Sequence, residues 1–198
     1  MLASHCKRAK LTGLAALSLL GACSSGGGVI ERLDSTSGLT FVSGDEVVAF
    51  ARTDARLSRS ARDYVYLGPV EVNERGTREY FLWVGIASTI DRNYVTEELQ
   101  MPNVLLLDLA GAPVEFELQP WDEALPRLRG QRVYEPPVRV RSVLIARVTL
   151  DQLALMSREP VARVRTVVEN AAPVEYFVWN SILEWPEFLR NAGVAEVR

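Results

Sequence analysis

The chain has 198 residues, of which 48% are hydrophobic and 24% are charged, and its formal net charge is −3. This composition excludes a disordered polymer and fits one compact domain, or at most two small ones. Both cysteines, both lysines and the only histidine lie within the first 23 residues, and the rest of the chain has no His and no Lys. The average composition therefore combines two segments of different composition, the first 23 residues and the rest of the chain.

Residues 1–22 have the pattern of a secretory signal peptide. Lys7, Arg8 and Lys10 form a basic segment, and an apolar run over residues 11–20 follows it before two small residues. As a helix, the run of roughly ten residues would span only about 15 Å, half the hydrocarbon thickness of a membrane. Since no later stretch approaches about 20 uninterrupted apolar residues, we expect no transmembrane span after it.

The leader ends in Leu20-Gly21-Ala22-Cys23, which resembles the lipobox of bacterial lipoproteins. The resemblance implies cleavage before Cys23, diacylation of its thiol and acylation of its new amino group. In that family an Asp after the Cys retains the protein in the inner membrane, so Ser24 favours the periplasmic face of the outer membrane. Two or more acyl chains make a stable anchor. The alternative is an ordinary cleavage site at these small residues, with Cys23 incidental.

After cleavage, the chain divides into a lipidated tether over residues 23–35 and a single β-rich periplasmic domain over residues 36–198. The leader holds three of the 22 basic residues and none of the 25 acidic ones, so the mature chain has a net charge of −6. An acidic domain argues against a nucleic-acid partner, because such binding requires a concentrated basic surface. With its one thiol lipidated, the mature chain forms no disulfide.

Alternation of apolar and polar residues predicts an antiparallel β-domain. We expect a first strand pair, then a hairpin around an Asn/Gly turn, in which Pro69 marks an edge or a bulge. A second hairpin and a Pro-rich loop with at most one helical turn follow. The predicted strands are 39–42 and 47–52, 63–72 and 77–85, 104–109 and 114–118, 138–148, 161–168 and 174–179.

Two short helices complete the prediction. Thr149 and Gln152 have the spacing of a capping box for a helix that ends near Ser157. A second helix is expected at about 181–191, with a start nearer Trp185 if Pro186 is to fit. The fold class is therefore mainly β, an antiparallel sandwich or barrel-like domain of about eight or nine strands with one or two short helices.

The composition removes most catalytic chemistry from the mature chain. Without His, Ser-His-Asp and Cys-His sites and His-based zinc or copper sites are impossible. Without Lys, Schiff-base chemistry and Walker-type phosphate loops are also excluded. We expect no metal and no cofactor, and we assign no catalytic residue.

Carboxylate chemistry remains, either as an acid pair of the glycosidase type or as Ca²⁺ ligands. No acidic cluster has the spacing of a Ca²⁺ loop, and solvated surface charge is the favoured interpretation of each. Asp122-Glu123 beside Trp121 suits contact with a sugar, although a turn with a packed Trp explains it equally well. The clusters are Asp45-Glu46, Glu97-Glu98, Asp122-Glu123, and Glu115 with Glu117.

Four arginines on two predicted strands form a candidate anion site. If the strands pair in register, their guanidiniums share one sheet face and bind a phosphate or carboxylate bidentately. The favoured alternative is cross-strand ion pairing, worth roughly 0.2 to 1 kcal/mol for each pair. The arginines are Arg139, Arg141, Arg163 and Arg165, and the acids available to them are Glu115, Glu117 and Glu175.

Aromatic residues form a candidate partner surface. Adjacent residues on a strand point to opposite faces, so part of the run Tyr80, Phe81 and Trp83 faces outward unless both faces are covered. Trp121 is the fourth member of this set. An outward row would bind a partner, and the favoured alternative is that a helix or a second sheet covers it.

The run from Asp63 to Asn73, the aromatic strand after it and the segment from Ser88 to Arg92 resemble uncharacterised small lipoproteins of Gram-negative bacteria. No activity is implied by that resemblance. The sequence therefore predicts an outer-membrane lipoprotein whose β-domain binds or scaffolds an envelope protein or glycan. The alternative is a carboxylate-dependent enzyme acting on an envelope glycan.

Overall fold

The structure is a computed structural model, which describes residues 28–53, 61–90, 101–159, 161–179 and 185–194. The strands and helices are, in chain order, β1 (Val29–Asp34), β2 (Leu39–Gly44), β3 (Val48–Thr53), β4 (Arg62–Glu74), β5 (Thr77–Ser88), β6 (Val104–Leu109), β7 (Ala112–Glu117), β8 (Gln119–Pro120), α1 (Trp121–Ala124), the 3₁₀ turn η2 (Pro126–Leu128), β9 (Val140–Val148), α2 (Leu150–Arg158), β10 (Arg163–Val167), β11 (Val174–Val178) and α3 (Pro186–Asn191).

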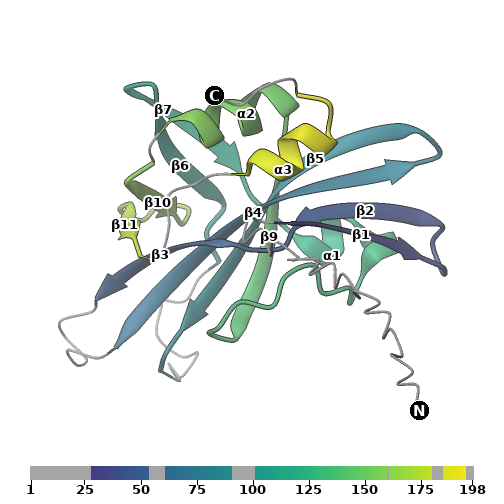
Figure 1. Ribbon diagram of the computed structural model, residues 1–198. Helices are drawn as coiled ribbons and strands as arrows, with labels where there is room; N and C mark the ends of the chain where they lie inside the picture. The colour runs from purple at the N-terminus through teal and green to yellow at the C-terminus, as the bar shows by residue number, and fades with distance from the viewer. Residues whose placement is uncertain (1–27, 54–60, 91–100, 160, 180–184, 195–198) are drawn as a thin grey trace, which may run out of the picture.

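Nine antiparallel strands follow one another in the order β7-β6-β10-β11-β3-β4-β5-β9-β8 and curve into a nearly closed barrel (Figure 1). The two ends of this path are adjacent in the chain, because β7 ends at Glu117 and β8 begins at Gln119. The sheet therefore curves back so that the first and last strands of the path follow one another in the chain. The prediction of a mainly β, antiparallel, barrel-like domain is confirmed, and the described part adds a third helix, α1.

Strand β4 is the central element, and it changes its partner along one edge. Its first half pairs with β3, from Arg62 to Leu67, and its second half pairs with β2, from Val70 to Asn73. Its other edge pairs with β5 over the whole length. Pro69, which has no N–H to donate, lies in the gap between the two partners.

Two predictions about the first strands are wrong. Strands β2 and β3 do not pair with each other as the expected first pair, because both lie along the same edge of β4. Residues 29–34, assigned to the tether, form β1, which pairs with β2 from Val29↔Gly44 to Asp34↔Leu39. Residues 29–34 therefore belong to the β-sheet.

The inner face of the barrel holds one apolar core. Side chains from alternate positions of the strands fill it, among them Phe50, Leu67, Leu82 and Leu144. Helices α2 and α3 lie side by side at one end of the barrel, and their buried residues belong to the same core (Figure 1). These apolar helix faces therefore seal that end of the barrel.

The local signals for both helices are confirmed. The Thr149 side chain accepts a hydrogen bond from the Gln152 backbone N–H (3.1 Å), and the Gln152 side chain accepts one from the Thr149 backbone N–H (2.8 Å). Helix α3 begins at Pro186 with Trp185 at its N-cap, where a proline costs no hydrogen bond. Predicted positions 181–184 lie outside the described residues.

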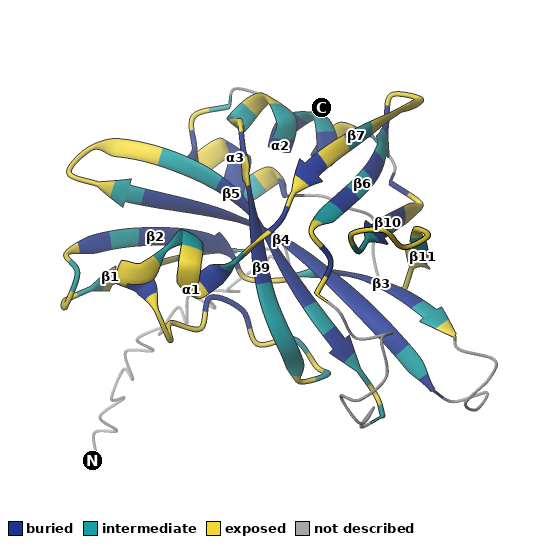
Figure 2. Cartoon of the chain, turned by 180° about the vertical axis from the view of Figure 1, so that it is seen from behind, coloured by how far each residue is buried: buried dark blue, intermediate teal, exposed yellow. Residues whose placement is uncertain are grey.

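A second apolar core covers the outer face of β2, β3, β4, β5 and β9. The segment that contains α1 and η2, together with Val133 and Tyr134, packs on this face. As a result, the middle of β4 is buried on both sides (Figure 2). This segment was predicted as a Pro-rich loop with at most one helical turn, whereas it forms both α1 and η2. Its packing role depends on apolar residues that show no periodicity.

The buried side chain of Tyr134 holds the outer segment on the point where β4 changes partner. Its hydroxyl donates to the Pro69 carbonyl (2.6 Å) and accepts from the Gly44 N–H (3.1 Å). Its ring lies against Gly68, where an added Cβ would come within 2.6 Å of the ring. One side chain therefore ties the end of β2 to the middle of β4.

Tyr134→Phe removes both hydrogen bonds and leaves the ring in place. Because the Pro69 carbonyl and the Gly44 N–H are buried in the native packing, we expect a loss of roughly 1 to 3 kcal/mol in the free energy of unfolding. Urea unfolding of the two proteins, followed by circular dichroism, measures this loss. An unchanged midpoint would show that the hydroxyl does not stabilise the junction.

Candidate functional site

The aromatic residues predicted to form a partner surface are covered. Phe81 and Trp83 are each 2% exposed and Trp121 is 4% exposed, and all three belong to the outer core. Tyr80 is partly buried against the inner core. The prediction of an exposed aromatic row is wrong for this set, because the α1–η2 segment packs over the outer face, and the Trp121 indole N–H donates to the Leu128 carbonyl (3.1 Å).

The four candidate arginines do not share one sheet face. Arg141 lies on β9 and Arg163 and Arg165 on β10, and the strand order places β11, β3, β4 and β5 between those two strands. Arg139 directly precedes β9 and is exposed. Arg141 donates instead to the Ile90 carbonyl. The proposed pairing of the two strands is therefore wrong, and with it the four-arginine anion site.

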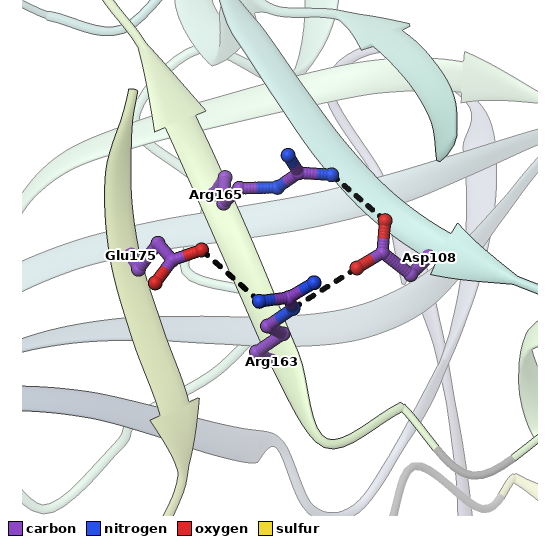
Figure 3. A network of polar contacts seen from close by, with 4 residues as sticks. All are labelled: Asp108, Arg163, Arg165 and Glu175. Atoms are coloured by element: carbon purple, nitrogen blue, oxygen red, sulfur yellow. Dashed lines mark hydrogen bonds and ion pairs between the residues drawn. The ribbon is translucent and has the colours of Figure 1, made fainter. Parts of the chain in front are cut away.

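Arg163 and Arg165 are paired with acids, as the alternative expected. Asp108 accepts from Arg163 Nε (3.0 Å) and from Arg165 Nη2 (2.7 Å), and Glu175 accepts from Arg163 Nη1 (3.3 Å) (Figure 3). The predicted pair with Glu175 is present, whereas Asp108, which was not predicted, bridges both arginines. Such a half-exposed network stabilises the sheet modestly and leaves these guanidiniums engaged.

Most of the acidic clusters are surface charge. Glu115 and Glu117 are exposed on β7 on either side of buried Phe116, which confirms the alternation expected for this strand. Asp122 accepts from the Gly130 N–H (3.2 Å) and lies 4.0 Å from Arg129. Glu97 and Glu98 lie outside the described residues, as do Cys23 and the rest of the lipobox.

Asp45 and Glu46 line a groove of about 370 Å³ on the outer face of the barrel. The groove lies between the turn that joins β2 and β3, the outward side chains of β3 and β4, and the segment that leads into β9. Its lining includes Tyr64, Tyr66 and Trp179. Concave sites lined by aromatic side chains with a few polar groups are the usual places for ligands.

Tyr64 and Tyr66 form the aromatic floor of the groove. They lie two residues apart on β4, and their rings are stacked at 5.7 Å with an angle of 7° between the planes. Tyr66 is 2% exposed, and burial raises the pKa of its hydroxyl, so it stays neutral. Tyr64 in turn meets the edge of Trp179, with ring centres 6.2 Å apart.

Trp179 is the exposed member of this set. Its backbone N–H donates to the Ala49 carbonyl (2.8 Å), which extends the pairing of β11 with β3 by one residue. The residue is 55% exposed although it lines the groove. The guanidinium of Arg62 lies 4.9 Å from the centre of its ring, within cation–π distance.

Three acidic residues line the same groove, namely Asp45, Glu46 and Glu135, and its lining contains no basic residue. No ion pair joins any of these three to another described residue. Asp45 and Glu46 were predicted only as an acidic pair. The groove itself was missed, because its residues come from segments far apart in the sequence and only the pairing of β3 with β11 and β4 brings them together.

Glu71 is a buried carboxyl group on the inner face of β4. It is 2% exposed, its Oε1 lies 3.4 Å from Arg78 Nε, and its Oε2 has no hydrogen-bond partner among the described residues. Burial raises the pKa of Glu71, Arg78 lowers it in part, and Glu31 on β1 raises it further. The neutral form of this carboxyl group is thus more favoured in the folded protein than in the unfolded chain.

The described residues contain no group of three or more His, Cys, Asp or Glu side chains that could hold a metal ion. Within the same part of the chain, no helix is long and apolar enough to cross a membrane. No protein-family model matches the chain, and searches of curated proteins and of solved structures found no significant match. A proposal about function therefore rests on the groove and on the pattern of residues 1–23.

Glu71→Gln keeps the shape of the side chain and removes its ionisation. The folded-state pKa is raised, so the contribution of Glu71 to stability is fully present below its unfolded pKa and is lost as the pH rises through the folded value. We expect the stability of Glu71→Gln relative to the native chain to increase from pH 4 to pH 8. Urea unfolding across this range measures it, and a difference that is constant with pH would contradict the assignment.

Proposed function

We propose that this chain is an outer-membrane lipoprotein, anchored at the periplasmic face through lipidated Cys23, whose β-barrel domain is a binding or scaffolding module. The anchor is supported by the order of basic segment, apolar run, small residues and Cys in the leader. The acyl chains attach the domain to the membrane surface, and the residues after Cys23 connect them to β1.

The observation that carries the binding role is the groove over β3 and β4. Trp179 stays 55% exposed beside Tyr64, and a large aromatic side chain left partly in water next to a hollow is typical of an interaction site. The groove replaces the covered aromatics of β5 as the candidate surface. An envelope protein or a glycan is the class of partner that a domain anchored at this place would meet.

A carboxylate-dependent enzyme acting on an envelope glycan is the second candidate. One observation favours it, since Asp45, Glu46 and Glu135 line a groove that also has aromatic walls. Glycosidases use two carboxyl groups on either side of the scissile bond, roughly 5 to 10 Å apart. The binding role is preferred because surface acids are far more common than catalytic pairs.

Glycan cleavage separates the two candidates. Purified chain is incubated with glycan strands from its own envelope, and new reducing ends are measured. Because a binding module breaks no glycosidic bond, we expect no release above that of a heat-denatured control. Release that disappears in Glu135→Gln would replace the binding role with the enzymatic one.

Cys23→Ser tests the anchor. It removes the thiol that receives the diacylglyceryl group, so we expect labelled fatty acid to disappear from the protein and the domain to leave the membrane fraction. The measurement is metabolic labelling followed by membrane fractionation, with Ser24→Ala as the matched control. Continued labelling of Cys23→Ser, or its continued membrane attachment, would contradict the anchor.

A further inference from the structure

We propose that the groove over β3 and β4 binds a basic side chain, Arg or Lys, of a partner protein, with apolar residues of the same partner segment lying on β11. This inference deepens the proposed binding role and rests on it. It names the chemistry that the partner must present, which is a positive group beside apolar side chains.

The lining of the groove is acidic. Its lining includes Asp45, Glu46 and Glu135 and no basic residue, and these acids form no ion pair within the described part of the chain. Three exposed carboxylates around one groove attract a cation and repel an anion. A neutral sugar would leave that charge unused.

The aromatic side chains of the groove also favour a cation. Faces of Trp and Tyr rings attract guanidinium and ammonium groups, and Trp179 already holds the guanidinium of Arg62 at 4.9 Å from its ring centre. Trp179 still exposes 55% of its surface. Aromatic walls combined with carboxylates form the environment that recognises organic cations.

A second hollow shares Trp179 with the groove. It is lined by Arg52, Arg62, Glu175 and Trp179 among others, and Arg52 forms an ion pair with Asp63 at 2.9 Å. The two arginines therefore do not neutralise the acidic groove from within its lining.

The apolar surface beside the groove favours a protein over a free small cation. Phe177 and Val178 are 54% and 40% exposed, and with Trp179 they make three consecutive exposed apolar residues at the end of β11. Contiguous exposed apolar residues next to a polar pocket are typical of protein interfaces. A small cation would use the groove and leave this surface in water.

The test uses the full lipidated chain in detergent and a blocked fluorescent pentapeptide, Gly-Leu-Arg-Leu-Gly. A counterpart with neutral citrulline in place of arginine has the same apolar content and corrects for binding to detergent. We expect the arginine peptide to bind at least tenfold more tightly in fluorescence polarisation, with an affinity that falls as salt is raised. Equal binding of the two peptides would overturn the proposal.

Variants locate the binding in the groove. We expect Trp179→Ala to weaken binding of the arginine peptide about tenfold or more, and Glu135→Gln to weaken it about threefold or more. Trp179→Phe should restore part of the loss. The matched controls are Leu33→Ala and Glu123→Gln, which change an exposed apolar residue and an exposed acid elsewhere. Circular dichroism establishes that each variant is folded, and equal losses in the controls would overturn the site.

Two further outcomes separate this inference from the proposed function. Binding of envelope glycan strands that is lost in Trp179→Ala, without binding of the peptide, overturns the basic partner and leaves the binding module standing. Crosslinking of the native chain in its own envelope tests the module itself. If a specific partner is crosslinked equally by native chain and Trp179→Ala, the groove inference fails alone, and if none is crosslinked by either, both fail.

Discussion

The architecture depends on how the edge of β4 is divided between two partners. Strand β4 is long enough to pair with β3 and then with β2, and at the division Pro69 has no N–H to offer. Tyr134 closes this weak point, because its buried hydroxyl bonds both to β4 and to the end of β2. The same side chain fixes the outer segment on the sheet, and burial raises the pKa of that hydroxyl, which keeps it neutral. The wall of the groove that includes Glu135 is positioned by this contact.

Local sequence patterns were sufficient for the hairpins and for the class of fold. Alternation in β7 and around β10, the turns after β4 and β6, and the Thr149 capping box are properties of short segments. Strand β1 was missed because its side chains are mostly exposed or half-buried and follow a Gly/Ser run that indicates a tether. The sequence does not indicate which distant strands pair with each other. The predictions of the first strand pair and of the four-arginine face were therefore both wrong.

The candidate site also could not be predicted from local sequence patterns. Tyr64 and Tyr66 share a face by simple alternation, but the sequence gives no sign that this face has a second cover with a hollow beside it. In the sequence, Trp179 is only the last residue of a predicted strand. Its place beside the groove follows from the pairing of β11 with β3. Conversely, Phe81 and Trp83 looked available for binding because the packing of α1 and η2 over them involves residues without periodicity. Surface chemistry here is a product of tertiary contacts between weakly patterned segments.

The barrel can form only when strands that are far apart in the sequence pair with each other. The hairpins β4–β5 and β6–β7 bring together neighbours in sequence, whereas the contacts of β11 with β3 link residues more than a hundred positions apart. Loop-closure entropy delays such contacts, so folding is expected to be slow compared with that of a helical bundle. Until the barrel closes, hairpin edges with apolar faces stay open to pairing with other chains. The nearly closed barrel thus leaves fewer open edges than its separate hairpins, and the chain is most exposed to aggregation before the distant strands pair.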